Sequence, residues 1–408
     1  MKRKKNNKII NDPVYGFIKI ENEVILKLID HPYLQRLRRI SQLGMSYLVY
    51  PGANHTRLQH VVGSMFLMSK AINQIQNKGH NISKYEKEAL EIAMLLHDIG
   101  HGPFSHALES SIVTNLNHED ISLLFMQKLN KEFNGDLAIS IEIFKDIYKK
   151  KFLHKLVSSQ LDMDRLDYLK RDSFFSGVVE GNIGTERIIN MLDIVDNELV
   201  IEEKGIYSIE KFLIARRLMY WQVYLHKTVI ASENMLIKIL KRAKSLISKK
   251  IDVPASPELT IFLKNNFTIN DFKENDKLLD NFSYLDDFDI YACLKEWCKH
   301  SDTVLSSLSK MILNRNLLKI KIQNKPFTED EINSYVQAHM KKTNMNEMDA
   351  RYFVFSHKVS NKAYAFDKGK INILMKNGTI QDISMVSDQF NIEFLSKSVN
   401  KYFICYQD

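Results

Sequence analysis

Apolar residues recur three and four positions apart along most of the chain between about residues 22 and 340. Examples of this spacing are Val24-Ile25-Leu28, Leu34-Leu37-Ile40, Val61-Met65-Met68-Ile72, Ala89-Ile92-Ala93-Leu96 and Leu156-Leu161. Residues at these intervals share one face of an α-helix, and that face packs against a core. The sequence therefore predicts a mainly α fold.

Short β-type patterns interrupt the helical pattern and dominate the end of the chain. Such runs are Tyr47–Tyr50, Glu198–Glu202, Tyr352–Phe355, Ile371–Met375 and Tyr402–Tyr406. The run at 198–202 precedes a glycine and is expected to form one arm of a hairpin. We expect a helical domain over residues 1–325 and a smaller mixed α/β lobe over residues 326–408, with 251–275 as a loop or lid.

The composition is that of a globular protein without a membrane span. The chain has 408 residues, of which 45% are hydrophobic and 26% charged, and its apolar runs are too short to cross a bilayer. The basic start MKRKKNNK is not followed by the apolar run of a signal peptide, so a cytoplasmic protein is expected. Three cysteines (Cys293, Cys298 and Cys405) lack zinc-site spacing and are read as reduced thiols.

The charge balance favours an anionic ligand. The formal net charge is +8, with basic clusters at residues 1–8 and 239–250. Because positive charge is spread along the chain, it favours a nucleotide or phosphate ligand over a nucleic-acid partner, which stays possible.

Three histidines and an aspartate follow an apolar helical stretch within ten residues. The run is His97-Asp98-Ile99-Gly100-His101-Gly102-Pro103-Phe104-Ser105-His106. A buried aspartate loses its hydration, which costs several kcal/mol unless a cation or hydrogen-bond donors replace the water. Histidine and aspartate together suit divalent metals. The glycines and the proline end the helix, so that His97 and Asp98 can reach one ion. The alternative is a histidine-rich helix cap.

Further metal ligands must come from other segments. One candidate is His60, which opens an apolar helix one turn after Arg57. Another is the segment 161–172, in which apolar residues alternate with four aspartates: Asp162, Asp164, Asp167 and Asp172. A structural histidine and a solvated acidic helix face are the alternative interpretations.

The order His60, His97-Asp98, Asp164 resembles the H…HD…D pattern of the HD superfamily of metal-dependent phosphohydrolases. Within it, the chain is most similar to deoxynucleoside triphosphate triphosphohydrolases, the group that includes the vertebrate SAM-and-HD restriction factor. The matching segments are 11–16, 30–63, 97–106, 118–119, 162–172 and 216–227. The resemblance implies an HD-domain helical core and a C-terminal lobe used in assembly. It also implies that these four residues bind a divalent metal, either Mn, Fe, Zn, Ni or Mg.

The implied reaction is attack of hydroxide on the α-phosphorus of a dNTP, which releases deoxynucleoside and triphosphate. A histidine with a pKa near neutrality suits protonation of the leaving 5′-oxygen, and His106 is the expected acid. His101 and His118 match other pocket histidines of the family, and Glu109 matches an orienting carboxylate. The expected substrate-binding residues are Arg57, Arg165 and Arg216 for the phosphates, and Gln42, Leu43, Tyr168, Asp172 and Tyr224 for a deoxyribose.

The resemblance further implies regulation by nucleotides. A guanine pocket, which would bind GTP or dGTP as activator, corresponds to Lys8, Asn11, Asp30, Gln35 and Arg38. A neighbouring dNTP pocket corresponds to Val49, Tyr50, Arg187, His226 and Lys227, although residues 200–204 lack the family's run of arginine and lysine. Such pockets lie between subunits, so a homo-oligomer, either a dimer or a tetramer, is expected.

Two other classes of function remain open from the sequence. An HD phosphodiesterase or nucleotidase, acting on other nucleotides or nucleic-acid ends, would use the same ligands and release different products. A nucleotide-sensing or single-stranded nucleic-acid-binding protein would need no turnover. The complete ligand set and the lack of a dense basic-aromatic strip disfavour the last class.

Overall fold

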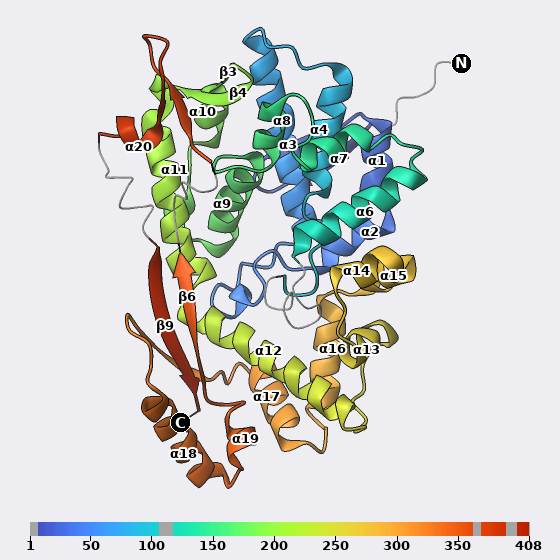
Figure 1. Cartoon of the computed structure of the whole chain (residues 1–408), viewed down its shortest axis with the longest axis vertical. Coiled ribbons are helices and arrows are strands. Elements are labelled where there is room, and N and C mark those ends of the chain that lie inside the picture. The colour runs from blue at the N-terminus through green and yellow to red at the C-terminus, as the bar shows by residue number, and fades with distance from the viewer. Residues whose placement is uncertain (1–6, 106–116, 362–368, 389–397, 408) are drawn as a thin grey trace.

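The computed structural model describes residues 7–105, 117–361, 369–388 and 398–407 (Figure 1). The helices up to residue 190 are α1 (Glu23–Asp30), α2 (Pro32–Gln35), α3 (Arg57–Asn77), α4 (Lys84–Leu96), α6 (His118–Glu132), α7 (Ala138–Phe144), α8 (Lys151–Val157), α9 (Met163–Ser176) and α10 (Thr185–Asn190). The later helices are α11 (Ile206–Met219), α12 (Lys227–Ser248), α13 (Pro257–Lys264), α14 (Ile269–Glu274), α15 (Asp276–Tyr284), α16 (Asp287–Trp297), α17 (Thr303–Leu313), α18 (Glu329–Thr343), α19 (Glu347–Ala350) and α20 (Ile383–Val386). The prediction of a mainly helical chain is confirmed.

The described strands form three small sheets. They are the hairpin β1 (Lys8–Asp12) with β2 (Gly16–Ile20), the sheet β3 (Leu192–Val195), β4 (Glu198–Glu202), β7 (Asn372–Leu374), β8 (Ile380–Asp382), and the sheet β5 (Lys319–Gln323), β9 (Val399–Tyr406), β6 (Phe355–Asn361), each in spatial order. The β3–β4 hairpin and the mixed α/β character of the C-terminal part are confirmed. Strands β7 and β9 pair with β4 and β5, so C-terminal segments complete sheets that begin earlier in the chain.

Helix α3 lies at the centre of the N-terminal half, where it packs against α4 and α9 (Figure 1). The apolar positions Val61, Met65, Met68 and Ile72, which predict this helix, are all buried. Burial of such side chains is the main driving force for helix packing. In the part of the chain that the structure describes, no helix is long and apolar enough to cross a membrane.

The turn after α4 fits tightly against the start of α6. The amide of Gly100 donates to Oγ of Ser122 at 2.9 Å, and this hydroxyl donates to the carbonyl oxygen of His97 at 2.7 Å. A Cβ at position 100 would lie 2.2 Å from the carbonyl oxygen of His118, so only glycine allows this approach. The contact fixes the end of α4, where His97 and Asp98 lie.

Two sequence-based expectations are wrong. The run Tyr47–Tyr50 is not a strand, because a 3₁₀ turn over Ser46–Leu48 satisfies its backbone locally. The amides of Val49 and Tyr50, for example, both donate to the carbonyl oxygen of Ser46 at 2.9 Å. The stretch 251–275 is not a loop, since it contains α13 and α14, and its alternative role as a lid stays a prediction. Phe262 and Phe272 from these helices pack with ring centroids 6.3 Å apart.

Two boundaries also differ from the expectation. The strand expected at 352–355 begins only at Phe355 and continues to Asn361 as β6. The N-terminal hairpin was not expected, although Asp12 and Gly16 encode its turn. The carboxylate of Asp12 accepts the amides of Val14 and Tyr15, and Gly16 has φ +78°. The division at residues 325 and 326 stays a prediction.

Replacing Gly100 by alanine is expected to destabilise the protein by about 1–3 kcal/mol, because the methyl group collides with the backbone of α6. Urea unfolding followed by circular dichroism measures this change. Gly184→Ala is the control, since its Cβ would meet only the Cβ of Arg187 at 3.9 Å. Equal stability of the two variants would contradict the close packing of this turn.

Candidate metal centre

Three helices bring the predicted metal ligands together. His60 lies in the first turns of α3, and Asp164 lies in the first turn of α9. His97 is the C-cap residue of α4, and Asp98 follows it where the helix has ended. Because the end of a helix is less constrained than its interior, the side chains of His97 and Asp98 can both turn toward His60 and Asp164.

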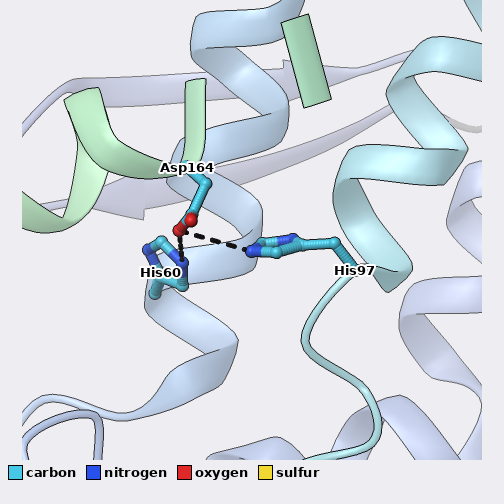
Figure 2. Close-up of side chains that lie close together, drawn as sticks. All are labelled: His60, His97 and Asp164. Atoms are coloured by element: carbon cyan, nitrogen blue, oxygen red, sulfur yellow. Dashed lines mark ion pairs between the residues drawn. The ribbon is translucent and has the colours of Figure 1, made fainter. Parts of the chain in front are cut away.

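The side chains of His60, His97 and Asp164 point toward one another (Figure 2). Nε2 of His60 lies 3.1 Å from Oδ1 of Asp164, and Nε2 of His97 lies 3.5 Å from the same oxygen. Asp98 joins this group, with Oδ1 3.4 Å from Nε2 of His97 and Oδ2 3.6 Å from Nε2 of His60. Two imidazole nitrogens and two carboxylates therefore converge on one point.

The orientation of both imidazoles fits a divalent cation. Nδ1 of His60 bonds to Oδ2 of Asp167 at 2.7 Å, and Nδ1 of His97 bonds to the carbonyl oxygen of Met94 at 2.6 Å. These acceptors require a proton on Nδ1, so each ring presents the lone pair of Nε2 to the centre, as in metal-binding histidines. Both Nε2 atoms are buried and make no hydrogen bond within the described residues. This group of residues could therefore hold a divalent metal.

The electrostatics of the group also favour a cation. Burial raises the pKa of Asp164, but the contacts with His60 and His97 outweigh burial and hold it well below its usual range. Burial lowers the pKa of His60, whereas the contacts with Asp164 and Asp167 raise it to about 10. The carboxylates thus attract positive charge, which a divalent cation supplies while leaving the imidazoles neutral.

Two of the predicted phosphate-binding arginines lie beside this group. Nη1 of Arg57 contacts Oδ2 of Asp98, and its Nε donates to Oγ of Ser105 at 2.8 Å. Arg165 follows Asp164 on α9 and pairs with Asp162. Asp162 itself caps α9, because its Oδ1 accepts the Arg165 amide at 2.8 Å. This capping role distinguishes Asp162 from the four predicted metal ligands.

Of the other predicted histidines, the structure describes His101 and His118. Nε2 of His101 lies 3.4 Å from Oδ1 of Asp98, and the rings of His101 and His118 stack with centroids 3.9 Å apart. Burial, together with the charge of a nearby arginine, lowers the pKa of His101 to about 3, so this imidazole is neutral near pH 7. His106 and Glu109 lie outside the described residues.

Three predicted sugar-pocket residues contact one another near the predicted metal ligands. The hydroxyl of Tyr224 donates to Oδ2 of Asp172 at 2.8 Å, and the Tyr168 and Tyr224 rings meet edge to face at 6.1 Å. The Tyr168 ring lies 6.5 Å from that of His60. Nε2 of His55, which the sequence analysis did not single out, lies 2.8 Å from Oδ1 of Asp172 and holds this carboxylate from the other side.

Other predicted substrate residues carry buried polar atoms that make no hydrogen bond within the described residues. These atoms are Oε1 of Gln42 and Nε of Arg216, although Nη1 of Arg216 donates to Gln160 at 3.2 Å. Leu43 is buried beside Gln42. Because buried polar atoms are normally satisfied, a polar ligand is a reasonable partner for both atoms.

Four of the five residues of the predicted guanine pocket are linked by hydrogen bonds or lie on adjoining helical segments. Nζ of Lys8 lies 2.6 Å from Oδ1 of Asp30, and Nε of Arg38 donates to Oε1 of Gln35 at 2.8 Å. Gln35 in turn donates to the carbonyl oxygen of Ile29, the neighbour of Asp30, at 2.7 Å. Asn11 does not lie with these four residues. It is exposed, and it lies on the face of the hairpin opposite to the face that carries Lys8.

The residues of the predicted second pocket lie in two places. The Tyr50 and His226 rings are 6.1 Å apart, Val49 precedes Tyr50, and Lys227 begins α12. Arg187 lies on α10, where it donates to the carbonyl oxygen of Lys204 at 3.1 Å. Within one chain, Tyr50 and His226 therefore lie close together, whereas Arg187 contacts a different segment, at Lys204.

Sequence reasoning missed several residues that support the ligands. Asp167 bonds to His60, Arg171 bonds to Asp167, and Asp12 bonds to Arg171. One signal was present for Asp167, because it lies three residues after Asp164 and hence on the same face of α9. No spacing rule links Asp12 to α9, since that contact depends on the tertiary fold.

Comparisons with known proteins agree with this geometry. The HD domain family matches residues 57–172, and the family described as the HD associated region matches residues 183–256. The chain is 31% identical over 400 residues to the uncharacterized protein YwfO of Bacillus subtilis, covering 93% of this chain and 88% of that protein. It is 28% identical over 284 residues to human deoxynucleoside triphosphate triphosphohydrolase SAMHD1, covering 59% of this chain and 45% of that protein. A phosphohydrolase crystal structure from Bacteroides thetaiotaomicron matches with a TM-score of 0.95 and 53% identity, covering 98% of this chain and 100% of that chain.

Replacing Asp164 by alanine is expected to weaken Mn²⁺ binding at least about 100-fold, because it removes a carboxylate shared by both imidazoles. Isothermal titration of the chelator-treated protein measures the affinity, and circular dichroism checks the fold. Asp136→Asn, which changes an exposed aspartate, is expected to bind as the unchanged protein does. Mn²⁺ affinity that survives in Asp164→Ala would refute the assigned ligand.

Proposed function

Because this chain belongs to the HD-domain family of metal-dependent phosphohydrolases, we propose that it hydrolyses dNTPs to deoxynucleoside and triphosphate. The observation that supports this most is the convergence of His60, His97, Asp98 and Asp164 beside buried cationic side chains. The similarity to a human deoxynucleoside triphosphate triphosphohydrolase supports the substrate class.

The arginines around the ligands would bind the substrate phosphates. A bound Mn, Fe, Zn, Ni or Mg ion would activate water and neutralise phosphate charge. Arg57, Arg165 and Arg216 would hold oxygens of the polyphosphate. Arg57 and Arg216 are buried and the side chain of Arg165 is 20% exposed, so solvent screening of such contacts is weak. The planar guanidinium groups can each make two parallel hydrogen bonds to a phosphate.

A histidine would give the leaving 5′-oxygen its proton. We propose His106 for this role, with Glu109 as the group that orients it. The neutral His101, stacked on His118, would line the same side of the metal group, next to Asp98. Protonation of this oxygen completes cleavage of its bond to the α-phosphorus, so that the nucleoside leaves the intact triphosphate.

The sugar pocket would select deoxyribose by shape. Asp172 and Gln42 would bind the 3′-hydroxyl, and Tyr224 is held in place by its hydrogen bond to Asp172. Since C2′ adjoins C3′ in the sugar, the ring of a tyrosine fixed at this carboxylate would occupy the space that a 2′-hydroxyl needs. Selection by bulk requires a fixed ring, and the edge-to-face contact with Tyr168 holds this ring in place in addition to the hydrogen bond.

Tyr224→Ala is expected to reduce the preference for dGTP over GTP, expressed as the ratio of kcat/KM values, by at least about tenfold. Tyr224→Phe is the matched control, because it keeps the ring and loses only the hydroxyl. The ratio is independent of how much of each variant is folded. If Tyr224→Ala keeps the full preference, the ring does not exclude the ribose.

Product analysis tests the proposed reaction. Purified protein with Mn²⁺ is incubated with dGTP, and then with dATP in the presence and absence of GTP. We expect deoxynucleoside and triphosphate in equal amounts. Inorganic phosphate or a linear nucleotide would instead indicate an HD nucleotidase or phosphodiesterase. No turnover with any of these nucleotides would favour a nucleotide-sensing or single-stranded nucleic-acid-binding protein.

A guanine nucleotide, GTP or dGTP, would regulate this activity at the group formed by Lys8, Asp30, Gln35 and Arg38. A carboxylate can accept the N–H groups of guanine while an arginine donates to its O6.

The outer face of the hairpin, with Asn11 next to the exposed Phe17, supports assembly into a homo-oligomer, a dimer or a tetramer, because exposed apolar side chains favour protein contacts. Val49, Tyr50, Arg187, His226 and Lys227 would contribute to a second nucleotide pocket in such an assembly.

A further inference from the structure

A buried chain of charged side chains connects the N-terminal hairpin with a metal ligand. Oδ2 of Asp12 on β1 accepts a hydrogen bond from Nη1 of Arg171 at 2.8 Å. Nε and Nη2 of Arg171 donate to the two oxygens of Asp167 at 2.9 and 3.0 Å. Oδ2 of Asp167 in turn accepts from Nδ1 of His60 at 2.7 Å. Each link is within normal hydrogen-bonding distance.

We propose that Asp12 and Arg171 are positioning residues for the metal centre, acting through Asp167 on the tautomer and orientation of His60. This inference rests on the metal centre described above and extends it to a residue outside the segment that the HD domain family matches. The N-terminal hairpin would then be part of the catalytic unit.

Burial makes the charge balance of this chain important. Arg171 and Asp167 have no exposed side-chain area, and Asp12 is 4% exposed. The three groups carry one positive and two negative charges, which leaves one net negative charge facing Nδ1 of His60. Without the charge of Asp12, Arg171 would neutralise Asp167 and weaken it as an acceptor. Inside a protein such a change is poorly screened.

The neighbouring helix leaves room for this chain of contacts. A Cβ at Gly63 on α3 would lie 2.1 Å from Nη2 of Arg171 and 2.2 Å from Oδ1 of Asp167. Glycine costs about 1 kcal/mol relative to alanine inside a helix. Glycine is needed three residues after His60 because any larger residue would collide with the guanidinium group of Arg171.

The hairpin holds Asp12 in a fixed position. Its Oδ1 accepts the amides of Val14 and Tyr15 at 2.9 and 3.0 Å, while Oδ2 is left for Arg171. The Tyr15 ring lies 5.5 Å from the guanidinium carbon of Arg171 and covers it. The shape of the turn and the contact with α9 therefore depend on the same carboxylate.

The test is Asp12→Asn, which keeps the shape and the oxygen that accepts the amides of Val14 and Tyr15 but removes the charge and the acceptor for Arg171. Isothermal titration of the chelator-treated full chain with Mn²⁺ is expected to show about tenfold weaker binding or more. We also expect a lower kcat for dGTP at saturating Mn²⁺ with little change in KM, because His60 does not bind the sugar or the base. Asp136→Asn is the control for removal of an exposed aspartate.

The outcomes separate this inference from the proposed function. Mn²⁺ affinity within twofold of the unchanged protein would overturn the role of Asp12, even if triphosphate release is normal. A lower melting temperature of the metal-free variant with unchanged Mn²⁺ affinity would also overturn it, since that pattern indicates a purely structural residue. If the unchanged protein binds no Mn²⁺, the metal centre itself fails, and this inference fails with it.

Discussion

The burial of carboxylates near one point is the constraint on which the rest of this structure depends. Asp98 is 6% exposed and Asp164 only partly exposed, and both lie within 4 Å of imidazole nitrogens. Unpaired carboxylates in such surroundings would be unfavourable by several kcal/mol. Imidazoles, arginines and a divalent cation are the groups that can compensate them. The chemistry of the site and the stability of its surroundings therefore have the same origin.

Close helix packing keeps these charges together. Helix α3 contributes His60 and also contacts α4 and α9, which position the other predicted ligands. Gly63 and Gly100 remove side chains where a guanidinium group or the backbone of another helix passes. These side chains are thus fixed by rigid elements, whose contacts would have to break before the side chains could separate.

The sequence predicted the helical class and the four residues that converge, because both depend on local spacing and on a recognisable order of ligands. It could not predict contacts that arise from tertiary packing, such as that between Asp12 and Arg171. The error at Tyr47–Tyr50 has a related cause, since β-branched and aromatic residues favour strands only where a neighbouring strand is available. The roles of His106 and Glu109 stay predictions, as do the regulatory residues.

The parallel pairing of β4 with β7 also bears on how this chain is made. Ile201 pairs with Ile373, and Ile320 of β5 pairs with Cys405 near the C-terminus. During synthesis both earlier strands leave the ribosome long before their partners exist, and their edges stay open in the meantime. Open strand edges can associate with other chains. The nascent protein would therefore be prone to aggregation until β7 and β9 have been made, and its dependence on chaperones would fall once these strands pair.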